Sequence, residues 1–312
     1  MKILVTGGAG FIASHIADKL IEKEHTVHIL DNLYAGKKEN INPKAIFHHL
    51  DIVQPETASL IIREEYDVIY HFAAQMDVRK SVDDPTFDAK VNILGTINLL
   101  EAALKAGTKK FIFASTGGAG YGEQEYFPAD EKHPIQPLSP YGIAKMSVEK
   151  YLYYYYQIHG LEYVTLRLAN IYGPRQSPKG EAGVVAIFCQ RLLNNEPAYI
   201  NGTGLQTRDY VYVSDVVEAA YSALHYPKCG AFNVSTGIET NVIQIFDYIN
   251  VYIGKNAPRL FADAKKGEQF RSVLSYQKIE NEMGWKPTVD IETGLKKTVE
   301  WFLEKQNTQK QG

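Results

Sequence analysis

Apolar residues along the first 170 positions follow two alternating patterns. Short runs of consecutive apolar and β-branched residues, typical of strands buried on both faces, alternate with longer stretches in which apolar residues recur every three or four positions. In the first of these stretches, Phe11–Lys23, the side chains of Ile12 and Ile16 lie on one helical stripe. This alternation predicts a doubly wound α/β fold, in which a parallel sheet carries helices on both faces.

The chain divides into a sheet domain and a smaller lobe. We predict strands over Lys2–Thr6, Thr26–Asp31, Ala45–Leu50, Asp67–Ala73, Lys110–Ser115 and Tyr163–Leu168, and helices over Phe11–Lys23, Pro55–Glu65, Pro85–Ala106 and Ser139–His159. Proline and glycine become frequent beyond about residue 170, where we predict helices over Val184–Asn194, Ser214–His225, Asn241–Tyr252 and Ile291–Lys305. We expect a sheet domain over residues 1–170, to which segments near residues 209–235 return, a mixed α/β lobe over residues 171–312, and fraying at Gln306–Gly312.

Composition narrows the function classes. A chain of 312 residues with 45% hydrophobic and 22% charged residues can bury a large core, and a net charge of −3 provides no general basic field for nucleic acid or an anionic membrane. No apolar stretch is long enough to span a bilayer, and the N-terminus enters a strand without the apolar region of a signal peptide. Cys189 and Cys229 are too few for a disulfide framework. We expect reduced thiols, a cytoplasmic protein and no metal site, because His48, His49 and His71 lack partners at ligand spacing.

The segment TGGAGFIA, residues 6–13, lies between the first predicted strand and the first predicted helix. This is the context of a dinucleotide-binding turn. Gly7 permits the tight turn, Gly10 allows the backbone to approach a pyrophosphate, and the start of the helix supplies N–H groups and a partial positive charge. Ala13 stands where a third glycine is usual, so the helix and the strand must separate slightly.

Asp31 ends the second predicted strand, 21 positions after Gly10. A carboxylate at this point accepts hydrogen bonds from both ribose hydroxyls of an adenosine and repels a 2′-phosphate. Asn32 and Leu33 follow, and neither can pair with such a phosphate. The pattern favours NAD over NADP.

Tyr141 and Lys145, in the segment YGIAK, are four positions apart on a predicted helix and therefore share a face. A free phenol has a pKa of about 10, so roughly one in a thousand is ionised at neutral pH. A nearby ammonium and the positive nicotinamide of NAD⁺ would stabilise the phenolate and make Tyr141 a general base. Tyr34 and Lys38 have the same spacing, but they lie in a predicted loop.

Hydroxyl groups stand at the end of the strand that precedes this helix. Ser115 and Thr116 are followed by a glycine-rich turn, residues 117–122, through which the backbone can approach a substrate. Either hydroxyl can relay a proton or bind a sugar hydroxyl.

These motifs belong to a longer series. The others, in order, are DNL from Asp31, HFAAQ from His71, NILGTINLLEA from Asn92, STGGAGYG from Ser115, LRLANIYGPR from Leu166, QTRDYVYV from Gln206 and MGWKP from Met283. With this series the chain resembles an extended short-chain dehydrogenase/reductase of the NAD-dependent epimerase/dehydratase family, and within it the UDP-glucose 4-epimerases.

The resemblance implies a Rossmann domain that binds NAD and a lobe that binds a nucleotide sugar. It places NAD against Gly7, Gly10, Phe11 and Ile12 at the pyrophosphate, Asp31 and Asn32 at the adenosine ribose, Asp51 and Ile52 at the adenine, Phe72, Ala73, Ala74 and Asn92 along its middle, and Tyr141, Lys145 and Ala169 at the nicotinamide end. It assigns the substrate diphosphate to Asn170 and Arg208, with Arg271, since guanidinium groups bind phosphates bidentately.

Two departures from the family pattern bear on the chemistry. Gly117 occupies the position at which these epimerases commonly carry a catalytic serine or threonine. We therefore assign the hydroxyl to Thr116, with Ser115 as the alternative, or expect the sugar hydroxyl to reach Tyr141 directly. The dehydratase branch carries Asp-Glu where this chain has Gly117-Gly118, so dehydration lacks its acid and base and we exclude it.

The expected activity is an NAD-dependent 4-epimerisation of a UDP-hexose through a transient 4-keto sugar. Ser272 falls at the position that gates the 2-substituent of the sugar, and a residue this small would admit UDP-GlcNAc and UDP-GalNAc beside UDP-glucose and UDP-galactose. A UDP-glucuronate 4-epimerase stays open, with Arg175 or Lys179 pairing with the carboxylate. A silent NAD-sensing protein and an alcohol dehydrogenase that releases NADH also stay open, whereas a decarboxylase lacks a dedicated acidic partner.

The resemblance also implies a homodimer through the helices around Asn92–Ala106 and Ser139–His159. The tyrosine-rich stretch Tyr151–Tyr156 fits either a helix face buried between two copies or the core of one chain.

Overall fold

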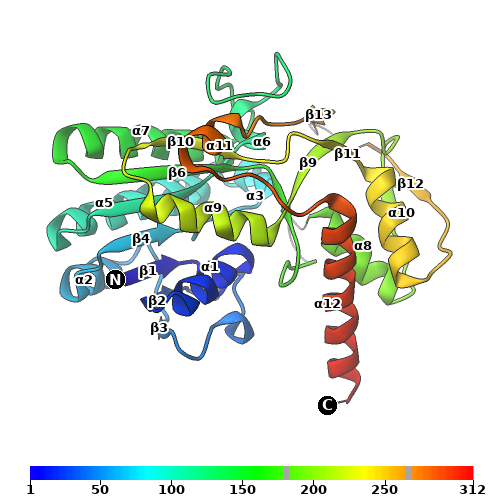
Figure 1. The fold of residues 1–312 in the computed structure, drawn as a ribbon, viewed down its shortest axis with the longest axis horizontal. Coiled ribbons are helices and arrows are strands. Elements are labelled where there is room, and N and C mark those ends of the chain that lie inside the picture. The colour runs from blue at the N-terminus through cyan, green and yellow to red at the C-terminus, as the bar shows by residue number, and fades with distance from the viewer. Residues whose placement is uncertain (179–182, 265–268, 312) are drawn as a thin grey trace.

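The computed structural model describes residues 1–178, 183–264 and 269–311. Its largest element is a parallel sheet of seven strands in the order β10-β6-β5-β4-β1-β2-β3 (Figure 1). The strands are β1 (Lys2–Thr6), β2 (Thr26–Leu30), β3 (Ile46–His48), β4 (Val68–His71), β5 (Lys110–Thr116), β6 (Glu162–Leu168) and β10 (Gly230–Val234). The predicted doubly wound parallel sheet is confirmed.

Helices cover both faces of this sheet. One face carries α1 (Phe11–Glu22) and α9 (Val213–His225), and the other carries α2 (Pro55–Glu64), α5 (Gly95–Ala106) and α7 (Pro140–His159). Successive strand residues supply the two cores in turn, since Ile3 and Val5 pack on the α1 side and Leu4 packs on the other. Each such buried side chain contributes roughly 1.5–3 kcal/mol through the apolar surface that it removes from water.

The smaller lobe lies beside the sheet, at the right of Figure 1. It contains α8 (Val184–Leu193), α10 (Val242–Ile253), α12 (Ile291–Gln311), a sheet of β11 (Glu239–Asn241), β9 (Thr207–Tyr212), β13 (Arg271–Ser272) and β7 (Asn170–Tyr172), and the pair β8 (Tyr199–Asn201) and β12 (Leu260–Ala262). Of the segments near residues 209–235, β10 joins the large sheet and α9 packs against α1, while β9 pairs with β7, β11 and β13.

Two predictions of local structure are wrong. The helix predicted over Pro85–Ala106 consists of α4 (Pro85–Ala89), a wider π-helical turn η2 (Lys90–Leu94) and α5. The hydroxyl of Thr96 donates to the Asn92 carbonyl at 2.7 Å, which satisfies a backbone group in the wider turn. The fraying predicted at Gln306–Gly312 does not occur at Gln306, whose amide donates to the Leu193 carbonyl at 3.3 Å, and α12 continues to Gln311.

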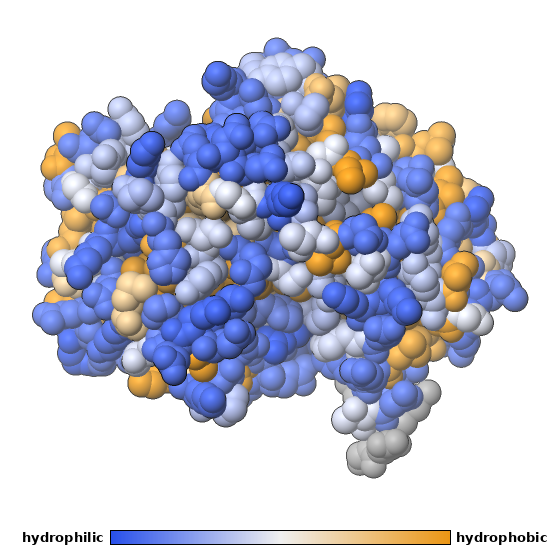
Figure 2. All heavy atoms as spheres, in the orientation of Figure 1, coloured by the Kyte–Doolittle hydropathy of each residue, from blue (hydrophilic) through white to orange (hydrophobic). Residues whose placement is uncertain are grey.

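Short elements complete the described chain. They are η1 (Lys38–Asn40), α3 (Val78–Asp83), α6 (Gly118–Tyr121) and α11 (Gln277–Met283). The face in Figure 2 is mostly hydrophilic over α1 and α9, with hydrophobic atoms scattered in small groups, which is ordinary for a globular surface. Within the described ranges, each helix is too short or too polar to cross a lipid bilayer.

Candidate functional site

The turn between β1 and α1 brings bare backbone to the carboxyl end of the sheet. Gly7 has a φ of +72°, and a Cβ on it would lie 2.7 Å from the Ala73 nitrogen. Gly10 precedes α1, whose first N–H groups donate to no capping side chain at Gly10. Those groups and the helix dipole suit the phosphates of a dinucleotide.

Asp31 lies at the end of β2, only 7% exposed. Its two oxygens accept hydrogen bonds from the backbone N–H groups of Ala9, at 3.0 Å, and Leu33, at 2.8 Å. Burial raises the pKa of this carboxyl, and the two hydrogen bonds oppose that rise. Sequence reasoning missed Gly36, where a Cβ would lie 2.8 and 2.9 Å from the two carboxylate oxygens, so a lone glycine lets the following loop close over Asp31.

The two residue pairs predicted at the adenosine are joined by a hydrogen bond. The Asn32 amide donates to Asp51 at 2.8 Å, which brings the end of β2 beside the loop after β3. Ile52 is buried beneath α5, where a Cβ on Gly95 would lie 2.8 Å from the Ile52 side chain. The missing side chain at position 95 therefore lets α5 approach this loop.

Beyond β4, Phe72, Ala73 and Ala74 are half-buried. The Asn92 side chain holds the next residue, because its oxygen accepts from the Gln75 N–H at 3.0 Å and its nitrogen donates to the Gln75 carbonyl at 2.8 Å. Asn92 therefore positions the loop after β4. Gln75 ends the HFAAQ motif, but the sequence assigned it no role.

The first turns of α7 bring Tyr141 and Lys145 together. The Ser139 hydroxyl caps the helix by accepting from the Gly142 N–H at 3.1 Å. Lys145 is 3% exposed, and its ammonium donates to the Ala114 carbonyl of β5 at 2.9 Å. The same nitrogen lies 5.8 Å from the centre of the Tyr141 ring, so the phenol and the ammonium face one site.

Burial dominates the protonation of this pair. It lowers the pKa of Lys145 from its ordinary 10.5 to about 8, against the charge of Asp88, and it raises the pKa of Tyr141, with a further rise from Asp88. The chain by itself therefore holds the phenol protonated at neutral pH. A phenolate here needs a second cation, such as the ring of a bound NAD⁺.

The two predicted hydroxyls have different surroundings. Ser115 donates to Glu149 at 2.6 Å, and Glu149 forms a buried ion pair with Arg167 at 2.7 Å, so this hydroxyl is engaged in the structural contacts between α7 and the sheet. Thr116 accepts from the Ala119 N–H at 3.3 Å and keeps its own proton for a substrate. Thr116 is therefore the better placed of the two.

The glycine turn after β5 leaves space beside these groups. A Cβ on Gly117 would overlap a terminal methyl group of Leu274, which would have to move to make room for a side chain. A Cβ on Gly118 would lie 3.8 Å from the Ser272 hydroxyl, so Ser272 faces the turn. Ala169, at the end of β6, packs against the apolar cluster that contains Leu274.

The residues predicted at the diphosphate share the small sheet. Asn170 is exposed on β7, and Arg208 on β9 pairs with Ser272 on β13. The Arg208 guanidinium donates to the Thr207 and Gln269 carbonyls, each at 2.7 Å. Arg271 forms a two-pronged ion pair with Glu239 at 2.6–2.9 Å, a partner that sequence reasoning missed, so a diphosphate would compete with that carboxylate.

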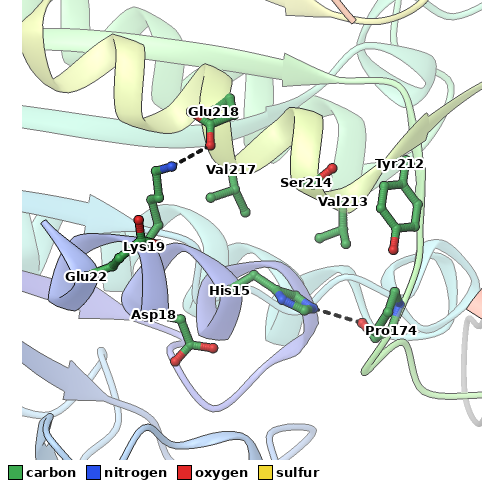
Figure 3. Close-up of a pocket in the computed structure, with 10 residues that line it drawn as sticks. All are labelled: His15, Asp18, Lys19, Glu22, Pro174, Tyr212, Val213, Ser214, Val217 and Glu218. Carbon is green, nitrogen blue, oxygen red and sulfur yellow. Dashed lines mark hydrogen bonds and ion pairs between the residues drawn. The ribbon is translucent and has the colours of Figure 1, made fainter. Parts of the chain in front are cut away.

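A separate hollow of about 280 Å³ opens between α1 and α9 (Figure 3). Lys19 and Glu218 form an ion pair at 2.6 Å on its wall, and His15 bonds to the Pro174 carbonyl at 3.0 Å. Nearby, Arg175 pairs with Asp18 of α1 at 2.8 Å. The candidate cation Arg175 is thus held at α1, and Lys179 lies outside the described residues.

In the described part of the chain, no three histidine, cysteine, aspartate or glutamate side chains form a group that could hold a metal ion.

The chain is similar in sequence and in structure to a group of known enzymes. The sequence pattern of the NAD dependent epimerase/dehydratase family matches residues 3–235. UDP-glucose 4-epimerase of Mycolicibacterium smegmatis is 42% identical over 312 residues, which cover 98% of this chain and 99% of that protein.

Two solved structures are similar over nearly the full length. One is a crystal structure of UDP-glucose 4-epimerase with UDP-glucose from Thermotoga maritima, with a TM-score of 0.96 and 47% identity over 98% of this chain and 100% of that chain. The other is the Thermus thermophilus UDP-glucose 4-epimerase in complex with NAD, with a TM-score of 0.92 and 43% identity over 97% and 99% of the two chains.

We predict that Gly7→Ala weakens both the fold and the binding of NAD. The new Cβ meets the Ala73 nitrogen at 2.7 Å with φ at +72°, and strain of this kind costs on the order of 1–3 kcal/mol. Denaturant unfolding and calorimetric titration with NAD measure the two effects, and we expect the affinity for NAD to fall at least about tenfold, or about 1.4 kcal/mol.

Gly107→Ala is the matched control. Gly107 has nearly the same φ, +71°, but its Cβ would meet no atom within 4 Å and it lies at the far end of α5. This variant should lose stability alone. Equal NAD affinity in the two variants would contradict the assignment of the turn.

Proposed function

The chain belongs to the NAD dependent epimerase/dehydratase family, and we propose that it interconverts the C4 epimers of a UDP-hexose with bound NAD. One observation carries this proposal: Tyr141 and the buried ammonium of Lys145 meet at the carboxyl edge of the parallel sheet, beside Thr116 and the glycine turn. The similarity to UDP-glucose 4-epimerases over nearly the whole chain supports the substrate class.

The residues present fit NAD. The Gly7 turn and the uncapped start of α1 accommodate the pyrophosphate, and the buried Asp31 carboxylate accepts from ribose hydroxyls while excluding a 2′-phosphate. NAD bound there would supply the acceptor, and then the donor, of a hydride at C4 of the sugar. Lys145 uses one acceptor, the Ala114 carbonyl, and keeps further N–H donors for the nicotinamide ribose.

Tyr141 acts as the general base and acid in this proposal. It removes the proton of the C4 hydroxyl, directly or through Thr116, and later returns it to the opposite epimer. Between the removal and the return of the proton, the 4-keto sugar rotates to present its opposite face, while Asn170, Arg208 and Arg271 hold the diphosphate. Gly118 leaves open space toward Ser272 for that rotation.

The alternative functions would give different results with UDP-sugars. A UDP-glucuronate 4-epimerase needs a cation at the C6 carboxylate, and Arg175 is already paired with Asp18. An alcohol dehydrogenase would release NADH, and an NAD-sensing protein would form no product. Incubation with a panel of UDP-sugars without added cofactor separates the epimerases by their products. Release of NADH into solution when NAD is added would reveal the dehydrogenase, and a sensing protein would give neither result.

We further propose a homodimer through α5 and α7. Leu152 and Tyr155 of the tyrosine-rich stretch are buried within the chain, so part of this stretch serves the core. Ile143, Tyr154 and Ile158 are 48–65% exposed and lie on one stripe of α7. A second copy of the same face would cover these side chains.

Tyr141→Phe should lower turnover at least about a thousandfold, or roughly 4 kcal/mol of barrier, because it removes only the proton-carrying oxygen. The assay follows UDP-galactose and UDP-glucose by chromatography. Ser115→Ala, which leaves Thr116 in place, should retain most activity. Normal epimerisation by the Phe variant would disprove the assignment of the base.

The gating hypothesis predicts that the wild type converts the N-acetylated pair as well as the plain pair. Ser272→Tyr should lower kcat/KM for UDP-GlcNAc at least about tenfold, since the larger side chain fills the space beside Gly118. The value for UDP-glucose should change much less. An equal loss for both sugars, or a wild type that rejects the acetylated pair, would exclude Ser272 as a gate.

Tyr154→Glu should shift the protein from dimer to monomer in sedimentation, because it places a charge in the covered face. Tyr199→Glu is the matched control, since Tyr199 is also 48% exposed but lies on β8 of the smaller lobe. A wild type that sediments as a monomer would refute the dimer.

A further inference from the structure

Asp88, on α4, is a buried carboxylate that the proposed chemistry does not use. It is 1% exposed. One oxygen accepts from the amide groups of Gln75 at 3.0 Å and Asn92 at 2.9 Å, whereas the other has no hydrogen-bond partner among the described residues. An ionised carboxylate in such a place is costly unless an opposite charge lies near.

Among the described residues, Lys145 is a buried cation that lacks an anionic partner at ion-pair distance, as Asp88 lacks a cationic one. Its ammonium is buried, donates to one carbonyl and lies 4.7 Å from the centre of the Phe113 ring. No carboxylate within the described ranges comes within ion-pair distance of it. Because α4 packs against α7, Asp88 and Lys145 act on each other electrostatically across that contact.

We propose, on the basis of the proposed epimerase function, that Asp88 is the counter-charge of the Tyr141–Lys145 pair and a positioning residue for its protons. It keeps the Lys145 ammonium charged in the dry site, and it sets the pH range in which Tyr141 exchanges a proton. Gln75 and Asn92 hold the carboxylate in place for this role.

The electrostatic influences on the pair agree with this geometry. Among the residues that the structure describes, Asp88 is the charge that acts appreciably on these two groups: it raises the pKa of Tyr141, and it raises that of Lys145 against the stronger effect of burial. Burial raises the pKa of Asp88 itself, and the hydrogen bonds from Gln75 and Asn92 and the charge of Lys145 lower it.

Other charged groups near this contact are screened, paired or neutral. The charged residues on α3 and η2 are exposed or half-buried, namely Arg79, Lys80, Asp83 and Lys90. On α7, Glu149 is paired with Arg167. From β4, His71 is neutral, because burial and the charge of Lys145 hold its pKa well below the usual range.

Removal of the Asp88 charge should shift the pKa values of Lys145 and Tyr141 in the same direction. Without Asp88 the Lys145 ammonium loses its stabilising anion, so its pKa falls. The Tyr141 phenolate loses a repelling anion, so its pKa falls as well. Both limbs of the pH profile of kcat/KM, the acid limb of Tyr141 and the alkaline limb of Lys145, therefore move to lower pH.

The test is Asp88→Asn, which keeps the shape and an oxygen that can accept from Gln75 and Asn92. We expect both limbs to move down by about one pH unit, the scale of the effect of one close buried charge. Asp88→Glu should restore the wild-type limbs, and Asp83→Asn, at an exposed carboxylate on α3, should leave them in place. Limbs that stay in place in Asp88→Asn would overturn the proposal, whatever happens to kcat.

A second measurement does not depend on activity. The titration of Lys145 can be followed by ¹³C NMR of the lysine methylene groups, assigned with a Lys145→Met variant. Its midpoint should fall in Asp88→Asn and stay in place in Asp83→Asn. A wild type without epimerase activity would refute the proposed function alone, whereas an unchanged midpoint would refute the role of Asp88.

Discussion

The buried ammonium of Lys145 is the interaction on which the site depends. It ties α7, which carries the phenol, to the Ala114 carbonyl in the middle of the parallel sheet. A charge in this position is tolerated because a carbonyl, two aromatic rings and the Asp88 carboxylate share its compensation. Burial brings the pKa of this ammonium to about 8, so its protonation responds to whatever binds beside it.

Burial of this site also makes the protonation of Tyr141 depend on whether a cofactor is bound. Desolvation raises the pKa of Tyr141, and the charge of Asp88 raises it further, so the chain by itself keeps the proton on the phenol. A cationic ring in the site changes that balance. Reactivity that appears only with the cofactor in place protects the sugar from unproductive proton exchange.

The space proposed for the sugar depends on the glycines after β5 and on the small side chain of Ser272. Leu274 fills the space that a side chain at position 117 would occupy. Gly118 leaves the neighbouring space open toward Ser272. Two distant parts of the chain, the glycine turn and the segment of Ser272 and Leu274, thus lie side by side at this point.

The sequence by itself determined the parallel sheet, the turn at Gly7, the acid at Asp31 and the Tyr141–Lys145 pair, because each depends on spacing within one strand, turn or helix. Only the tertiary structure decided that Ser115 turns to Glu149, that Arg271 pairs with Glu239, and that the buried Asp88 raises the pKa of Tyr141. Each of these interactions joins groups from separate elements. Burial also shifts the pKa of such groups, because it removes the water that stabilises their charged forms. Neither the partner nor the burial is encoded in local periodicity, so both become visible only when the elements have packed.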